Sequence, residues 1–417
     1  MSMIRTLSDS LRFAADWSRL VWGPQRKSKR SDRHMALMAR ALPPSSIAGV
    51  HRPLSWMRYG ETLGWRVTSF QSETPVNQRE HGDELLALVP QSVHRWVVPS
   101  LPWKPAWRLT PQIDGGFPLA LAFARHAART MADDPPSVVL ASGPPFFSFV
   151  AAWVTARHFG VPLVVDYRDE WTECPFDFVT KGPDDLRWER RCLRDAAAVL
   201  FTTESMRAHH LLRFPELHPS RAHLLPNGWE PSDFEQANPR LPDRSIGAPI
   251  TVSHIGNLAG HAAPDNFLAS LSRVLTKYPD WQHRLRLQLV GRRSDQVETA
   301  LRGFAFPGLL TLIDHVGKRE ANERMARSDA LLLLASPDLE RYFPSKLFDY
   351  LASRRPVLVF GAEGEAANAV KQLGAGVCCP DSDPDALHAA LAQLSANPSQ
   401  PSSSRLEAWL VDHRRDV

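Results

Sequence analysis

The chain has 417 residues, of which 43% are hydrophobic, and it carries 49 Lys and Arg against 45 Asp and Glu. This length predicts two domains with separate cores, and the hydrophobic content excludes a disordered chain. A net charge of +4 suits an acidic ligand or an anionic membrane surface, but the sequence lacks the dense basic stripe typical of a nucleic-acid binder. The four cysteines form no CxxC pair, so we expect no zinc site, no disulfide framework and a reducing cytoplasm.

Residues 1–34 predict an amphipathic helix followed by a basic segment. Apolar residues recur at helical spacing from Ile4 to Val21 and include Trp17, and a cluster of cations follows, namely Arg26, Lys27, Lys29 and Arg30. Two interpretations stay open: an interfacial helix with a polybasic flank, or a helix packed on the first domain. Charged residues interrupt this stretch, so no signal peptide is expected, and no run of 18 apolar residues predicts a membrane span.

Residues 35–225 alternate between predicted strands and helices. The strands are expected at 35–42, 65–70, 137–141, 162–166 and 198–201, and the helices at 51–63, 119–131, 147–159 and 184–195. The segment 74–118, rich in proline and tryptophan, is predicted to be irregular. Such alternation favours a parallel sheet that is covered on both faces.

After an expected interdomain linker at 226–249, a second alternation occupies residues 250–394. Its strands are predicted at 250–255, 285–290, 309–314, 330–335 and 357–360, and its helices at 265–275, 294–301, 320–327 and from 344 onward. Residues 395–417 are expected to form a linker and a last short helix. The predicted fold class is therefore α/β, with two Rossmann-like parallel-sheet domains facing a central cleft.

The stretch 344–351, with the sequence PSKLFDYL, carries the strongest chemical signal. Its apolar residues give one helical face, and Lys346 lies beside the unpaired N–H groups of the helix N-terminus, a place that attracts phosphate. Asp349 follows one turn later, where a carboxylate would hold a ribose hydroxyl pair. A nucleoside diphosphate would fit both residues, and a solvated ion pair is the alternative interpretation.

Other candidates follow predicted strands, because ligands of open parallel sheets bind beyond the carboxyl ends of the strands. Three such loops in the second domain place a glycine after an apolar run, and glycine lets backbone N–H groups approach a phosphate that nearby cations neutralise. The candidate donor-binding residues are Gly256, Asn257, Arg292, Val316, Ser345, Lys346 and Asp349.

The first domain offers two loops at strand ends, Ser142–Pro145 and Asp166–Trp171. The second loop packs three acids, an arginine and a tryptophan into six residues. Carboxylates in this place would orient acceptor hydroxyls, and Trp171 would stack on a sugar face or a lipid. The alternative is a salt-bridged loop in which the tryptophan is a structural plug.

These motifs resemble those of the GT-B glycosyltransferases, specifically the family 4 type found in bacterial exopolysaccharide, capsule and O-antigen assembly. The resemblance covers about residues 35–394. It rests on the proline and glycine loop at 43–52, the SGPP turn at 142–145, the DxRDxW loop at 166–171, the PNG element at 226–228 and the donor helix at 344–351.

The resemblance implies sugar transfer from a nucleoside diphosphate sugar to a hydroxyl acceptor, with retention of configuration and without a metal or other cofactor. The acceptor would be a glycan or a lipid-linked intermediate of surface polysaccharide synthesis, and the protein would be cytoplasmic or peripheral at the inner membrane face. The implied catalytic residues are Asp169, Arg168 and Lys346. The implied acceptor-binding residues are Gly49, Arg52, Asp166 and Trp171.

The chain departs from the family pattern at three places. Arg341 stands where a first glutamate is common, with Glu340 one residue out of register, the 43–52 loop has few glycines, and His261 replaces an arginine. Two alternatives therefore stay open, a catalytically impaired GT-B scaffold and a nucleotide-sugar epimerase. A dinucleotide oxidoreductase is excluded because no GxGxxG follows the first strand.

Overall fold

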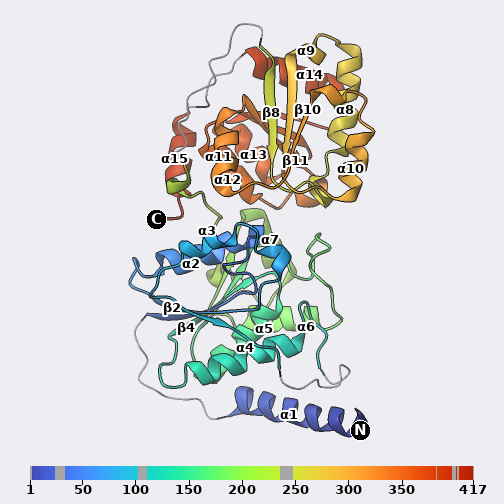
Figure 1. Cartoon of the computed structure of the whole chain (residues 1–417). Helices are drawn as coiled ribbons and strands as arrows, with labels where there is room; N and C mark the ends of the chain where they lie inside the picture. The colour runs from blue at the N-terminus through green and yellow to red at the C-terminus, as the bar shows by residue number, and fades with distance from the viewer. Residues whose placement is uncertain are drawn as a thin grey trace. The chain divides into compact units, whose positions relative to one another are not determined.

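The computed structural model describes residues 2–23, 33–101, 110–234, 248–381, 383–396, 401 and 403–416. The chain divides into two compact units, Met1–Leu225 and Pro226–Val417. Each unit is a parallel β-sheet with helices packed on both of its faces (Figure 1). The predicted α/β class with two Rossmann-like sheets is confirmed.

The first unit contains a seven-stranded sheet in the order β3-β2-β1-β4-β5-β6-β7, and every neighbouring pair is parallel. The strands are β1 (His34–Met38), β2 (Arg66–Gln71), β3 (His94–Val97), β4 (Val138–Gly143), β5 (Leu163–Tyr167), β6 (Ala198–Phe201) and β7 (Ala222–Leu224). The helices are α1 (Ser2–Trp22), α2 (His51–Gly60), α3 (Gly82–Ala87), α4 (Phe117–Thr130), α5 (Phe147–Phe159), α6 (Asp185–Asp195) and α7 (Glu204–Arg213).

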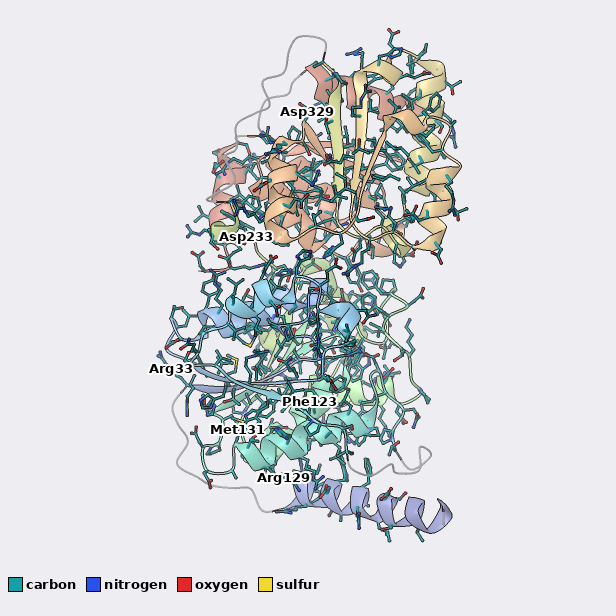
Figure 2. All side chains as sticks on the ribbon, viewed as in Figure 1. Arg33, Phe123, Arg129, Met131, Asp233 and Asp329 are labelled. Carbon is teal, nitrogen blue, oxygen red and sulfur yellow. The ribbon has the colours of Figure 1, made fainter. Side chains whose placement is uncertain are left out.

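Helix packing in the first unit follows the apolar pattern of each helix. In α4, Phe123 is buried, as is Met131 just after the helix, whereas Arg129 is exposed (Figure 2). Helix α1 contacts α4 and α5, and its Trp17 ring lies 5.2 Å from Phe117 and 6.4 Å from Trp153 between ring centroids. The Trp17 face therefore packs on the unit, so this face cannot enter a membrane.

The second unit contains a six-stranded parallel sheet in the order β10-β9-β8-β11-β12-β13. The strands are β8 (Ile250–Ile255), β9 (Leu285–Val290), β10 (Leu310–Ile313), β11 (Ala330–Ala335), β12 (Val357–Gly361) and β13 (Gly376–Cys379). The helices are α8 (Asp265–Lys277), α9 (Trp281–Arg284), α10 (Asp295–Arg302), α11 (Lys318–Arg327), α12 (Ser345–Ala352), α13 (Glu365–Leu373), α14 (Pro384–Ala396) and α15 (Ser404–Asp412). The two faces of this sheet bury separate apolar clusters.

The structure contains elements that the sequence did not predict, namely the strands β3, β7 and β13 and the helices α3, α7, α9, α13 and α14. The segment 74–118, predicted as irregular, contains α3 and β3, although its residues 102–109 lie outside the described part. Strand β3 reads HRWV and is largely exposed, so it lacks the buried apolar alternation that marks a strand. The short strand β7 is missed for the same reason, since only its first residue is buried.

The basic cluster Arg26 to Arg30 and residues 235–247 of the predicted linker lie outside the described residues. The rest of the predicted linker packs on the second unit, because Trp229 donates from Nε1 to the Leu410 carbonyl of α15 at 2.8 Å. Within the described part of the chain, no helix is both long enough and apolar enough to cross a bilayer.

Candidate functional site

The order of the second sheet defines where a ligand is expected. The chain runs outward from β8 through β9 to β10, then returns to β11 beside β8 and continues to β13. The crevice beyond the carboxyl ends of β8 and β11 is therefore the topological switch point, the usual ligand position of such sheets. Gly256 follows β8 directly, and Lys346 lies in the first turn of α12, the helix after β11.

Gly256 and Lys346 meet at this switch point. Gly256 has a φ of +139°, which strongly favours glycine, and a Cβ atom there would lie 3.1 Å from the Lys346 ammonium nitrogen. The Gly256 loop also runs beside the next loop, because Leu258 donates its N–H to the Arg292 carbonyl at 2.9 Å. The structure thus brings together four of the predicted donor-binding residues, Gly256, Asn257, Arg292 and Lys346.

The two arginines after β9 have different surroundings. Arg293 donates to the Gly291 and Ile313 carbonyls and pairs with Glu298 and Asp314 at 2.6 Å each, so it holds the loop together. Arg292 is partly exposed in the same loop.

Lys346 has a histidine partner that the sequence analysis did not identify. Its Nζ lies 3.2 Å from Nε2 of His254, a residue near the end of β8, and His254 Nδ1 lies 3.1 Å from the Leu332 carbonyl of β11. Burial lowers the pKa of Lys346 to about 8. Burial, and then the Lys346 charge, hold the pKa of His254 well below 6.5, so this imidazole is neutral at pH 7. The available signal was a histidine in a predicted strand, two residues before Gly256.

Asp349 faces a different partner. Its Oδ2 lies 2.6 Å from Nζ of Lys318 at the start of α11, and Lys318 also lies 3.7 Å from Asp233. Asp349 Oδ1 is buried and has no hydrogen-bond partner among the described residues. Lys346 and Asp349 thus engage separate partners, which contradicts the interpretation of the two as one solvated ion pair.

The remaining donor candidates flank these groups. Ser345 is exposed at the first position of α12. Val316 is partly buried against the apolar cluster that includes residues of β11 and α12. Val316 thus offers its backbone, rather than a polar side chain, to a ligand.

A pocket of about 320 Å³ lies in the second unit beside the switch point. Its walls come from the connection between β8 and α8 and from the ends of β11 and β12, and they include His261, Asp265, Ser336, Gly361 and Asp381. His261 Nδ1 lies 3.3 Å from Asp338 and 3.4 Å from Ser336 Oγ. Nearby in sequence, Arg341 lies 3.8 Å from Glu340.

In the first unit, Arg52 and Asp166 form a buried pair. Asp166 is the next-to-last residue of β5 and is fully buried. It accepts from Arg52 at 2.9 Å (Nε) and 2.7 Å (Nη2) and from Ser142 Oγ at 2.8 Å. Arg52 Nη2 also donates to the Leu225 carbonyl at 2.8 Å. A bidentate ion pair of this kind fixes both side chains, and it connects α2 to the sheet.

Arg168 joins three chain segments through backbone carbonyls. Its guanidinium donates to the carbonyls of Gly49, Gly143 and Pro144. A Cβ atom at Gly49 would overlap this guanidinium, so the close approach requires glycine. The three predicted first-unit loops, at 43–52, 142–145 and 166–171, therefore meet around one side chain.

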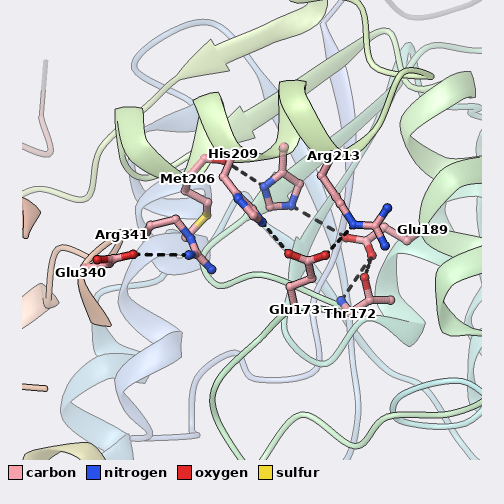
Figure 3. Close-up of polar contacts among 9 residues, drawn as sticks. Thr172, Glu173, Glu189, Met206, His209, Arg213, Glu340 and Arg341 are labelled. Carbon is pink, nitrogen blue, oxygen red and sulfur yellow. Dashed lines mark hydrogen bonds and ion pairs between the residues drawn. The ribbon is translucent and has the colours of Figure 1, made fainter. Parts of the chain in front are cut away.

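Asp169 follows Arg168 in a loop with firm anchors. Burial raises the pKa of Asp169 to about 6, against the opposing effect of the Arg168 charge. Figure 3 shows the anchors, in which Glu173 accepts from His209 at 2.5 Å and Arg213 at 2.6 Å, and Thr172 donates to Glu189 at 2.5 Å. A carboxyl with such a shifted pKa in a fixed loop is a candidate for catalysis.

Trp171 does not have the predicted role. The side chain is fully buried, and its ring stacks on Phe146 with centroids 5.0 Å apart and an interplanar angle of 6°. Its ring faces are therefore unavailable to a sugar or a lipid, and the prediction that Trp171 binds the acceptor is wrong. The alternative, a tryptophan that acts as a structural plug, is correct.

The described residues contain no group of three or more His, Cys, Asp or Glu arranged to hold a metal ion. A search of curated proteins gives no sequence match. Two family models match the chain, the glycosyl transferase 4-like domain over residues 50–228 and glycosyl transferases group 1 over residues 249–397. Together they cover most of both units.

Solved structures share the whole fold at low identity. Sucrose-phosphate synthase from Thermosynechococcus elongatus has a TM-score of 0.67 and 15% identity, over 91% of this chain and 94% of that one. The lipopolysaccharide outer core galactosyltransferase WaaB has a TM-score of 0.61 and 11% identity, over 91% and 95%. Anabaena HepE, solved with UDP-glucose, has a TM-score of 0.61 and 13% identity, over 91% and 95%. From the two family models and this shared fold, we conclude that the chain belongs to the GT-B glycosyltransferases of the family 4 type.

Proposed function

We propose that this glycosyltransferase moves a sugar from a nucleoside diphosphate sugar to a hydroxyl acceptor, with retention of configuration. The observation that carries the proposal is the Lys346 ammonium beside the Gly256 loop at the switch point of the second sheet. Departure of the diphosphate leaves negative charge on its oxygens. Lys346, Arg292 and the N–H groups at the start of α12 would stabilise that charge without a metal ion.

The ribose would bind Asp349. Lys318 holds one carboxylate oxygen, Oδ2, at 2.6 Å, and the other oxygen, Oδ1, has no partner among the described residues. An ionised carboxylate accepts hydroxyl hydrogen bonds strongly. We therefore propose that Lys318 orients Asp349 through Oδ2 and that Oδ1 accepts a hydrogen bond from the ribose hydroxyl.

The acceptor would bind the first unit near Asp169. With a pKa of about 6, this carboxyl is ionised at neutral pH and accepts the hydrogen of an acceptor hydroxyl. Arg168 would hold the loops around it, while Gly49, Arg52 and Asp166 would shape the same region. We expect Asp169→Asn to reduce transfer and to leave nucleotide affinity unchanged, and a loss of nucleotide affinity would move this loop to the donor side.

We propose a lipid-linked intermediate of surface polysaccharide synthesis as the acceptor, with the protein peripheral at the inner membrane face. Support comes from the fold shared with a lipopolysaccharide galactosyltransferase and from exposed Leu7, Leu11 and Trp22 on α1. The exposed fractions of these side chains identify the face that would meet the lipid, which is not the face that carries Trp17.

Calorimetric titration with UDP, GDP, CMP and their sugar conjugates tests the proposal. We expect one nucleoside diphosphate to bind, its sugar conjugate to be consumed only when an acceptor is present, and NMR of the product to show a retained anomer. Conversion of a sugar nucleotide without an acceptor would identify an epimerase instead. Absence of binding by every nucleotide would refute the donor site.

A second candidate function is a GT-B scaffold without turnover. Its support is Arg341, which stands at a position where a glutamate is common and lies 3.8 Å from Glu340. This candidate predicts nucleotide binding without transfer to any acceptor. An Arg341→Glu variant that gained transfer activity would favour it.

A further inference from the structure

His254 is a buried polar residue for which the proposed reaction has no role. It lies in β8 with no exposed surface, and its ring contacts the Leu332 carbonyl at 3.1 Å, Lys346 Nζ at 3.2 Å and the backbone of Asn257. The parallel pairing of β8 with β11 reaches Leu331 opposite Ser253. His254 therefore bridges the end of that pairing to the helix that carries Lys346.

The Leu332 and Lys346 contacts together are matched by an imidazole that carries its proton on Nδ1. A carbonyl only accepts hydrogen bonds, so Nδ1 must be protonated to contact Leu332. The imidazole is neutral because burial and the adjacent Lys346 charge oppose its protonation. Nε2 consequently presents a lone pair, and the Lys346 ammonium, which only donates, points one of its three N–H bonds at it.

This contact gives the lysine a defined position. A lysine side chain has four carbons of flexible stem, and its ammonium is a point charge without directional preference of its own. With one N–H bond held by His254, two remain for ligand oxygens beside Gly256, where a Cβ atom would lie only 3.1 Å from Nζ. Fixing a charge before the ligand arrives lowers the ordering cost of binding.

We propose that His254 is a positioning residue that holds the Lys346 ammonium at the β8–β11 switch point for the diphosphate of the donor. The role rests on the proposed donor site, and His254 acts through Lys346 without touching the substrate. The competing explanation is structural, namely that His254 only satisfies the Leu332 carbonyl.

A pair of amide substitutions separates the two roles. In His254→Asn the side-chain amide lies near the position of Nδ1, so it retains the Leu332 contact and loses Lys346. In His254→Gln the amide reaches the position of Nε2 and supplies an acceptor for Lys346. We expect His254→Asn to weaken binding of the nucleoside diphosphate selected by titration about tenfold, and His254→Gln to stay within about threefold of wild type. If His254→Gln lost more affinity than His254→Asn, the role of His254 would be structural and the proposal would be overturned.

A double-mutant cycle with Lys346→Ala gives the second readout. If His254 acts through Lys346, His254→Asn should add little to the loss that Lys346→Ala causes, whereas an equal further loss would overturn the proposal. If Lys346→Ala bound the nucleoside diphosphate as tightly as the wild type, both the donor site and this inference would be refuted. If Lys346→Ala bound the nucleoside diphosphate weakly and His254→Asn bound it as tightly as the wild type, this inference alone would be overturned.

A measurement without a histidine variant covers the case in which His254→Asn does not fold. Nitrogen NMR of the His254 imidazole should show a protonated Nδ1 in the wild type and an Nε2 signal that shifts in Lys346→Ala. A protonated Nε2, or an Nε2 signal that is the same in the wild type and in Lys346→Ala, would overturn the proposal.

Discussion

Lys346 keeps its charge in a partly buried position, and burial lowers the pKa of its ammonium to about 8. A phosphate binds the charged form, so affinity for a nucleoside diphosphate should be highest below pH 8 and fall as pH rises, by at most about tenfold per unit. Lys346→Met should bind about 10- to 200-fold more weakly below pH 8, since a charge-assisted contact contributes about 1.5–3 kcal/mol, and this variant should lack the fall. Calorimetry between about pH 7 and pH 9.5 measures the affinity of the wild type and of the variant. A wild-type affinity that stays unchanged over that range would contradict phosphate binding by Lys346.

The folding free energy has the opposite pH dependence at this residue. An unfolded lysine has a pKa near 10.5, so between about pH 8 and pH 10.5 the unfolded chain binds more protons than the folded one. The contribution of Lys346 to stability therefore rises with pH through that window while nucleotide affinity falls. Comparing thermal unfolding with and without nucleotide separates the two effects.

Asp349→Asn should impair donor binding through the ribose rather than through the phosphates. The substitution weakens the acceptor at Oδ1 and the contact with Lys318, which lies 2.6 Å from Oδ2 in the wild type. A deoxyribose analogue should lose affinity in the wild type and lose little more in the variant. Asp385→Asn is the matched control, because Asp385 pairs with Lys277 on the surface of the same unit. Equal losses in both backgrounds would argue against ribose contact.

For single residues, the sequence predicted where a side chain lies in the fold better than which other side chains it contacts. Lys346 and Gly256 could be chosen as candidates because Lys346 lies in the first turn of a predicted helix and Gly256 follows a predicted strand. His254 and Lys318 could not, because His254 is 92 residues from its partner Lys346 and Lys318 is 31 residues from Asp349. Trp171 misled for the reverse reason: its charged neighbours suggested an exposed loop, whereas the ring packs on Phe146.

At the scale of elements, the Arg52–Asp166 pair joins α2 to β5. Truncating one partner leaves the other as an uncompensated buried charge, so Arg52→Met should lower the free energy of unfolding by about 3–5 kcal/mol. Combining it with Asp166→Asn removes that charge, and the double variant should unfold at a higher temperature than Arg52→Met alone. A double variant less stable than the single one would show that Asp166 interacts mainly with other groups.

The central strands and their helices could be predicted because burial on both faces gives continuous apolar runs, as in β11 with the sequence ALLLLA. The edge strands β3 and β7 could not, because an exposed edge does not need such a run. The edge strand β13, with the sequence GVCC, and the helices α7, α13 and α14 were not predicted either. Helix bounds differ from the prediction by a few residues at the termini, for instance at α8, which ends at Lys277 rather than at residue 275.

For the whole molecule, the packing of α1 decides which variants can test membrane attachment. Phe13, Leu20 and Val21 of α1 are buried, and Trp17 packs against Phe117, so removing residues 1–34 would uncover the core of the first unit. Leu7 and Leu11 are 63% and 64% exposed, on the outer side of the helix. Point substitutions at Leu7 and Leu11 therefore test attachment without disturbing the packed face.

We expect the wild type to float with liposomes that contain anionic lipid and to dissociate at high salt, since each cation near such a surface contributes about 1 kcal/mol. Leu7→Ser combined with Leu11→Ser should reduce flotation, because apolar burial supplies the remainder of the binding free energy. Leu212→Ser is the matched control, as Leu212 lies on α7 and is 88% exposed. If the wild type stays in solution with every lipid, or if Leu212→Ser has the same effect, α1 serves only to complete the fold of the first unit.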